Sequence, residues 1–326
     1  MPKLNREFWV SAALVVALGI APIIATLVDE VYFVNLSSRI VIIAMAAVGL
    51  NLALGFGGMI SFGHAAFFGL GGYVAGISAY HAFDESLFLG LIPGSDQMLV
   101  IWPAAVIVAA LVALLIGAIS LRTKGVYFIM ITLAFAQMIY YFAISLPTYG
   151  GEDGLSIYVR NNLVGLDTND PLIFFAICFS ALILSLLFTH RIMGARFGAA
   201  LTMAKLNDVR LATSGIEPFP VRLVAFVLSA MIASGAGALF ADLNGFVGPS
   251  MLSWHRSGEI MVIVILGGVG RLFGPIAGAI VFVLLETMIG GITERWQFFL
   301  GLILLMVVLF ANGGLMGIAT GKAQHD

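Results

Sequence analysis

The chain has 326 residues, of which 61% are hydrophobic and 10% are charged, and its formal net charge is -2. A soluble domain typically carries ~25% charged residues, so this composition excludes a soluble globular fold and predicts a protein embedded in lipid. It has no dense basic patch of the kind that binds nucleic acid, and its one cysteine, Cys178, cannot form an intrachain disulfide.

Six apolar runs approach or reach the ~20 residues that a helix needs to cross a bilayer. They cover residues 8–28, 98–120, 126–146, 172–189, 221–243 and 297–314. Two further regions, residues 40–80 and 259–290, are long enough for two passes each but are interrupted by glycine. The sequence therefore predicts an all-α, polytopic membrane protein with about ten membrane segments, or about eight as the lower alternative. Residues 1–326 would form a single transmembrane domain.

The basic residues predict the orientation, because cytoplasmic loops are enriched in lysine and arginine. With ten segments and the N-terminus inside, eleven of the fifteen basic residues lie on the cytoplasmic side. The four that lie outside are Arg39, Arg160, Arg256 and Arg295. We therefore expect a multi-pass protein with both termini in the cytoplasm.

Two connections are too long to be simple turns. Residues 147–171 form the outer one, and glycines surround its acidic pair Glu152 and Asp153. Residues 191–220 form the inner one, in which residues 196–214 are expected to be helical up to Gly215. A cytoplasmic helix between two spanning helices is a natural docking surface, although it could also lie on the bilayer surface.

Glycines interrupt both of the double-pass regions. Residues 55–72 contain seven glycines in eighteen positions, and close helix packing is one explanation for them. Residues 259–271 would form only ~20 Å of helix before the glycines that follow, which is too short for a ~30 Å hydrocarbon core. A pair of short, glycine-interrupted segments, one in each half of a membrane protein, indicates a transport path.

The motifs of common enzymes are absent from the sequence. It has no Walker A motif, no zinc-binding His-Glu-x-x-His and no serine nucleophile elbow. We therefore expect no enzymatic activity, no metal site and no cofactor bound by this chain. Among the few polar residues at membrane depth, Glu286 is a functional candidate or a hydrogen-bonded acid near the outer interface. His64 is either a packing residue or a ligand.

Several short runs together carry a family resemblance. They are GLNL at 49–52, GFGGMISFGHAAFFG at 55–69, GGEDGL at 150–155, SGI at 214–216, AFVLSA at 225–230, GAGAL at 235–239, ILGGVG at 265–270 and GPIAGA at 274–279. Over roughly residues 40–286 the chain resembles the permease subunits of branched-chain amino-acid ABC importers, of the LivM type.

The resemblance implies a bacterial inner-membrane importer in which this chain forms half of the translocation path. Its partners would be a second, homologous permease subunit, two cytoplasmic ATPase subunits that use the ATP, and a periplasmic substrate-binding protein. The substrate would be branched-chain amino acids, although related permeases carry urea or short amides.

The resemblance also implies roles for individual residues. The broken segments would line the path, with these candidates: Asn51, Ser61, His64, Gly267, Gly268 and Glu286. The inner helix would couple to the ATPases through Met203, Lys205, Leu206, Asp208 and Gly215. Leu206 replaces an acid of the family pattern, and Glu152 with Asp153 would face the binding protein.

Two rival functions remain open at this point. A stand-alone secondary transporter or channel could use the broken helices as an ion-coupled site, but it would need more buried carboxylates than Glu286 alone. A purely structural membrane subunit is the other alternative, and the glycine-rich segments and long loops argue against it.

Overall fold

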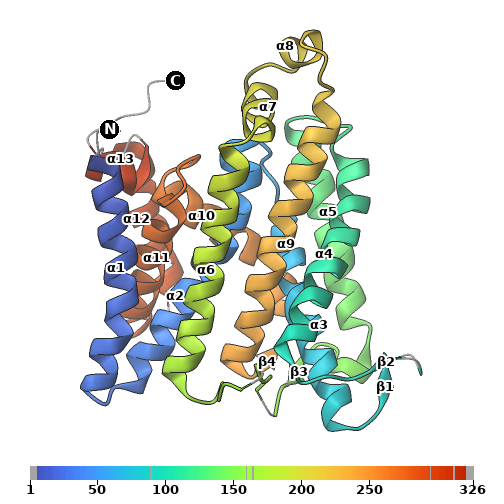
Figure 1. Cartoon of the computed structure of the whole chain (residues 1–326), viewed down its shortest axis with the longest axis vertical. Helices are drawn as coiled ribbons and strands as arrows, with labels where there is room; N and C mark the ends of the chain where they lie inside the picture. The colour runs from blue at the N-terminus through green and yellow to red at the C-terminus, as the bar shows by residue number, and fades with distance from the viewer. Residues whose placement is uncertain are drawn as a thin grey trace.

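The computed structural model describes residues 6–88, 90, 92–158, 160–163, 165–293, 295–310 and 313–320. This part of the chain is predominantly α-helical, and its long helices stand side by side in one bundle (Figure 1). The expected all-α class is confirmed for these residues.

Ten helices of 14 or more residues form the bundle in the described part of the chain. They are α1 Arg6–Leu27, α2 Val31–Asn51, α3 His64–Phe83, α4 Met98–Ser120, α5 Val126–Ile144, α6 Pro171–Met193, α9 Pro218–Asn244, α10 Trp254–Gly267, α11 Gly274–Gly290 and α12 Trp296–Phe310. Helix α2 continues into a π-helical turn, η1 Leu52–Phe56. Six of the long helices are long and apolar enough to cross a membrane: α1, α2 with η1, α4, α5, α6 and α9. The total of about ten crossings stays a prediction.

Shorter elements connect the long helices. They are α7 Arg196–Leu206, α8 Asp208–Thr213, α13 Gly314–Thr320, and the 3-10 turns η2 Pro147–Tyr149 and η3 Pro249–Leu252. Strand β1 Leu87–Phe88 pairs with β2 Ile92–Pro93, and β3 Leu155–Ser156 pairs with β4 Phe246–Val247, both antiparallel.

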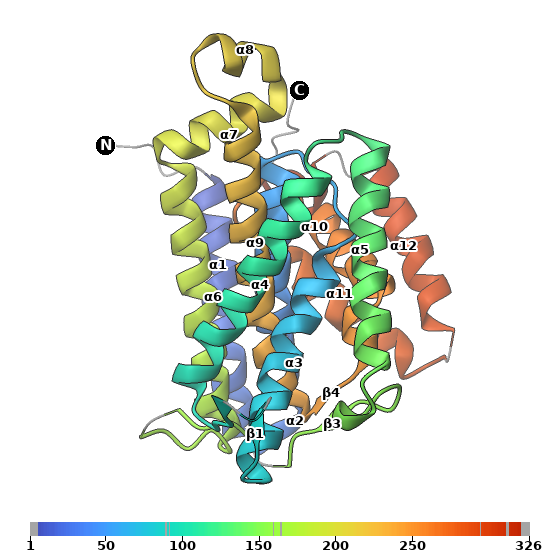
Figure 2. The ribbon, with the colours of Figure 1, turned by 90° about the vertical axis from the view of Figure 1, so that its right-hand side faces the viewer.

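These connections separate the two ends of the bundle. Helices α7, α8 and α13 lie at one end, here called the α8 end, and the strand pairs lie at the other, here called the β end (Figure 1). In the view turned by 90°, α7 and α8 project beyond the other helices (Figure 2). The two long predicted loops therefore lie at opposite ends of the bundle.

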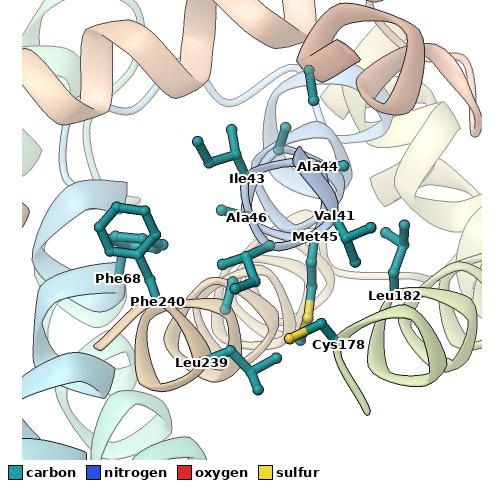
Figure 3. Packing of buried hydrophobic residues seen from close by; sticks show 14 of the residues in the cluster. Val41, Ile43, Ala44, Met45, Ala46, Phe68, Cys178, Leu182, Leu239 and Phe240 are labelled. Atoms are coloured by element: carbon teal, nitrogen blue, oxygen red, sulfur yellow. The ribbon is translucent and has the colours of Figure 1, made fainter. Parts of the chain in front are cut away.

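The core forms around α2 and α9, which pack on one another and on α3, α4 and α6. Figure 3 shows Met45 of α2 beside Cys178 of α6, and the rings of Phe68 and Phe240, whose centroids lie 5.4 Å apart. Glycine allows α3 and α9 to approach closely, because a Cβ at Gly237 would lie 1.7 Å from the carbonyl oxygen of Phe68.

The predicted inner helix over residues 196–214 is wrong in one respect, because it is broken in two. Asn207 adopts an extended conformation (φ -161°, ψ 111°) between α7 and α8. Its side-chain oxygen accepts hydrogen bonds from the N–H groups of Val209 and Arg210, so it caps α8. Asparagine favours such a cap over a helix interior, because its side chain competes for backbone hydrogen bonds.

Candidate functional site

The first break in a membrane helix follows η1, at residues 57–63. Asn51 supports it by donating to the carbonyl oxygen of Arg271 (2.9 Å) and accepting from the N–H of Gly270 (3.0 Å). A Cβ at Gly55 would lie 2.1 Å from the side-chain oxygen of Asn51. Glycine at position 55 is therefore required for the contact between the end of α2 and the loop after α10.

The start of α3 is held by a serine from another helix. Ser257 of α10 donates a hydrogen bond to the carbonyl oxygen of Phe62 (2.7 Å) and accepts one from the N–H of Ala65 (2.9 Å). The N–H of Gly63 bonds to Ser61 Oγ at 3.1 Å. The first turns of α3 and α10 therefore meet inside the bundle, away from either end.

The second break follows α9, at residues 246–253. The chain pairs as β4 with β3 and then turns back into the bundle through η3, which packs on α3 and α5. A Cβ at Gly69 would lie 2.3 Å from Leu252 Cδ2, and one at Gly72 would lie 2.7 Å from Met251 Cε. The glycines of α3 thus make room for this returning segment.

The first turn of α10 carries an ion pair that the sequence analysis did not identify. Arg256 Nη1 lies 2.7 Å from Glu259 Oε2, and their side chains are 22% and 32% exposed. Arg256 also lies over the ring of Phe240, 5.3 Å from its centroid. Arg256 is predicted on the outer side; the structure places it in the first turn of α10, and its side of the membrane stays a prediction. Its i, i+3 spacing to Glu259 was the available signal.

The residues beside the Arg256–Glu259 pair are also exposed. Trp254 and His255 are exposed beside it, and a Cβ at Gly258 would meet no atom within 4 Å. Charged side chains inside a membrane face protein or a water-filled cavity rather than lipid. This face of α10 is therefore suited to a polar path or to a protein neighbour.

His64 is fully buried and bonded within the bundle. Its Nε2 lies 2.7 Å from Ser229 Oγ, and Ser229 gives its own proton to the carbonyl oxygen of Gly49. Because that hydroxyl has only one proton, His64 Nε2 must be the donor. The rings of Phe67 and Phe226 meet the imidazole edge to face.

The remaining path candidates lie in two separate places. Gly267 and Gly268 join α10 to α11, where a Cβ at Gly267 would lie 1.9 Å from the carbonyl oxygen of Gly274. Glu286 of α11 forms a half-buried ion pair with Arg39 of α2, at 2.7 Å. This contact corresponds to the hydrogen-bonded interpretation of Glu286.

The structure therefore does not bring the six predicted path residues together. Asn51, Ser61 and His64 are buried and form hydrogen bonds within the bundle, whereas Glu286 pairs with Arg39 of α2. Their role in a path stays a prediction, and the contacts described here show how each one supports the helices around it.

The sequence analysis also did not identify a second charged cluster, formed around Asp242 and Arg160. Asp242 of α9 is 1% exposed and accepts a hydrogen bond from Asn161 Nδ2 at 2.6 Å. Arg160 donates to the backbone oxygens of Asp242 and Thr168 and lies over the ring of Phe174. These contacts fasten the connection after α5 to the end of α9. No group of three or more His, Cys, Asp or Glu side chains in the described ranges could hold a metal ion.

Helices α7 and α8 are tied to the bundle by charged residues. Lys205 Nζ donates to the carbonyl oxygen of Gly55 at 3.1 Å. Asp208 pairs with Arg222 of α9 at 2.8 Å and with Lys124 of the turn between α4 and α5. The α7 helix therefore contacts the glycine-rich stretch at the first break directly.

Helices α7 and α8 expose apolar side chains among polar ones such as Thr202 and Arg210. Met203 is 40% exposed, Leu206 is 78% exposed and Val209 is 70% exposed. Gly215 ends this unit with a φ of +86°, which glycine adopts readily. Exposed apolar side chains that project from a bundle end indicate a contact with another protein.

Glu152 and Asp153 are exposed at the opposite, β end of the bundle. They lie within a turn in which Gly150, Gly151 and Gly154 all have positive φ. A Cβ at Gly154 would lie 2.6 Å from the carbonyl oxygen of Val247, so this turn packs on β4.

Comparison with known proteins places this architecture in a family. A model of the branched-chain amino acid transport system permease component matches residues 32–309. The chain belongs to this family of permeases. The permease protein LivM of the high-affinity branched-chain amino acid transport system is 25% identical over 307 residues in Salmonella typhimurium LT2 and in Escherichia coli K12. Each alignment covers 87% of this chain and 69% of the relative. No solved structure matches the chain.

The family match identifies the class of protein. The chain is a multi-pass membrane permease subunit of an ABC importer, and the predicted resemblance is confirmed. The matched family consists of transport permeases, so the expected transport role without enzymatic activity in this chain agrees with it.

Proposed function

We propose that this permease forms half of the translocation path of a branched-chain amino acid importer in a bacterial inner membrane. The observation that carries this proposal is the direct link between Lys205, on the projecting α7–α8 unit, and the carbonyl oxygen of Gly55 at the first break. A partner that moves α7 would thereby move a membrane segment.

The α8 end then faces the cytoplasm, together with both termini, and docks one of two ATPase subunits that bind and hydrolyse the ATP. The exposed apolar residues Met203, Leu206 and Val209 supply the contact surface. The charged residues beside them, Lys205 and Asp208, are already paired within the chain. Their pairing holds the docking surface against the bundle. Leu206, which stands where the family pattern has an acid, contributes an apolar contact to this surface.

The path runs between this chain and a second, homologous permease subunit, along the exposed face of α10. An amino acid carries a carboxylate and an ammonium group, and the Arg256–Glu259 pair offers one complementary charge for each. Urea and short amides have neither a carboxylate nor an ammonium group, so this face favours an amino acid over them. A branched apolar side chain would find apolar neighbours such as Trp254 nearby.

The β end then faces the periplasm and receives the substrate-binding protein. Glu152 and Asp153 are exposed there and can pair with basic groups of that protein. We expect a Glu152→Lys, Asp153→Lys double variant to raise the concentration of binding protein needed for half-maximal transport. Transport that saturates at the wild-type concentration would remove these two residues from the docking surface.

Affinity purification of the tagged chain in mild detergent tests the proposal. We expect a second permease and ATPase subunits to co-purify, with ATP hydrolysis stimulated by the binding protein and its amino acid. A variant with Met203→Asp and Leu206→Asp should lose the ATPase subunits, whereas Arg122→Gln, an exposed change at the same end, should retain them. Uptake by the chain alone, without ATP, would instead support a secondary transporter. Stimulation by urea or an amide would change the substrate.

A further inference from the structure

Helices α4 and α6 leave a groove open on the outer surface of the bundle. Helix α4 packs on α9 and helix α6 packs on α2, whereas α4 and α6 do not pack closely on one another. The space between them is a groove of about 820 Å³ with an almost entirely apolar lining. Its floor is formed by α2 and α9, including Met45, Met231 and Leu239.

Gly235 contributes to the depth of this groove. A Cβ at this position would meet only the flexible end of Met45, at 3.1 Å, whereas a Cβ at nearby Gly237 would lie 1.7 Å from a backbone oxygen of α3. Gly237 is therefore required for helix packing and Gly235 is not. The absent side chain at Gly235 leaves room on the open side of α9.

The two ends of the groove differ in chemistry. Toward the α8 end it finishes at His190 and Arg191, which are exposed, and Arg191 forms no ion pair with any described residue. Toward the β end it finishes at the indole of Trp102. Along α6 the lining extends from Ala181 to Arg191, a rise of ~15 Å, which equals half of a ~30 Å hydrocarbon core.

We propose that this groove binds an anionic phospholipid, with an acyl chain along the floor and the headgroup phosphate against Arg191. An apolar groove in a bilayer is filled by hydrocarbon, and the flexible side chains of Met45 and Met231 can adapt to a chain. A basic group at the cytoplasmic end of a groove between membrane helices selects an anionic headgroup. The leaflet assignment rests on the proposed orientation; the binding itself needs neither ATP nor a partner.

Bound lipid would act as a spacer between α4 and α6. Helix α6 leads directly into α7, and the turn after α4 reaches α8 through the Lys124–Asp208 pair. A lipid between these helices would therefore hold the base of the α7–α8 unit at a fixed width.

Native mass spectrometry of the delipidated chain, supplied with phosphatidylglycerol or phosphatidylcholine, tests the proposal. We expect one phosphatidylglycerol to bind with about fivefold preference over phosphatidylcholine. Arg191→Gln should abolish this preference, whereas Arg122→Gln, an exposed arginine outside the groove, should retain it. Gly235→Leu should reduce binding of both lipids by filling the groove.

Three results would overturn the proposal. One is equal binding of the two lipids to the wild-type chain, and another is an equal loss of preference in Arg122→Gln and Arg191→Gln. The third is loss of the lipid when the complete importer assembles, because a protein helix would then be the occupant. If Gly235→Leu fails to fold, Arg191→Gln, which changes an exposed residue, still tests the proposal. None of these measurements uses transport, so they stand apart from the test of the proposed function.

Discussion

The breaks at residues 57–63 and 246–253 both lead the chain into a helix that begins inside the bundle, but their surroundings differ. At the first break, Ser61 and His64 are fully buried and both form hydrogen bonds within the bundle. The second leads into the first turn of α10, where Arg256 and Glu259 are partly exposed. The glycines also differ: those of α3 are required for contact with α9 and η3, whereas Gly258 of α10 meets open space.

Under the proposed function, these two breaks would have separate uses. At the first break, the interruption allows close packing and connects to α7 through Lys205 and Gly55. At the second, the chain turns back into the bundle and presents the Arg256–Glu259 pair on a partly exposed face. We infer that the first break transmits movement and the second faces the solute.

The largest effect that separates the two regions should come from a matched pair of glycine substitutions. Gly71→Ala would place a Cβ 1.9 Å from the carbonyl oxygen of Ser234, so we expect it to lower the free energy of unfolding by about 3 kcal/mol. Gly258→Ala meets nothing and should raise stability by up to ~1 kcal/mol, because alanine favours a helix over glycine. Thermal unfolding in detergent compares them, and equal midpoints would contradict the difference in packing.

The next largest effect should be on transport. Arg256→Gln removes the group proposed to bind a carboxylate, and we expect uptake by the reconstituted importer to fall about tenfold or more. The unfolding midpoint should change little, because a partly exposed ion pair contributes ~1 kcal/mol or less. Arg39→Gln is the control, since it breaks another partly buried ion pair, Arg39–Glu286, and should leave uptake per folded molecule unchanged. Wild-type uptake by Arg256→Gln would remove α10 from the path.

Local features of this fold could be predicted from the sequence, and contacts between distant segments could not. Helix α4 spans residues 98–120 as predicted, because apolar composition alone determines a lipid-facing helix. The break at Asn207 depends on a local cap that competes with helix propensity. The start of α10 at Trp254 depends on contacts of its first turns, including that of Ser257 with α3, which no run of sequence reveals.

The same limit applies to the candidate site. The unusual glycine content distinguishes residues 55–72 in the sequence, but the contacts of this stretch lie far along the chain. Glu286 pairs with Arg39, 247 positions away, and Lys205 with Gly55, 150 positions away. Composition identifies which polar groups lose free energy of hydration when they are buried. Only the packing of the helices shows which group pairs with each of them.

A smaller effect should follow from loss of the link between α7 and the first break. Lys205→Met removes the hydrogen bond to the carbonyl oxygen of Gly55 while keeping a long apolar side chain, so we expect about fivefold less transport per ATP hydrolysed. The ATPase subunits should still co-purify, because Met203 and Leu206 remain exposed. Arg210→Gln, which changes an exposed arginine on α8, is the matched control. A normal ratio of transport to hydrolysis in Lys205→Met would show that the movement takes another route.

The smallest effect should come from the single hydroxyl that joins the two regions. Ser257→Ala leaves the N–H of Ala65 without its acceptor at the start of α3, and we expect the free energy of unfolding to fall by about 1–2 kcal/mol. Ser180→Ala is the control, because Ser180 bonds only within its own helix and should change stability by a few tenths of that. If the two substitutions lower the unfolding midpoint equally, the contact between α10 and α3 does not stabilise the breaks, and the first turns would be free to separate during transport. If Ser257→Ala is the more destabilising, this hydroxyl holds the first turns of α3 and α10 together and offers one route by which movement of the first break reaches the charged turn of α10.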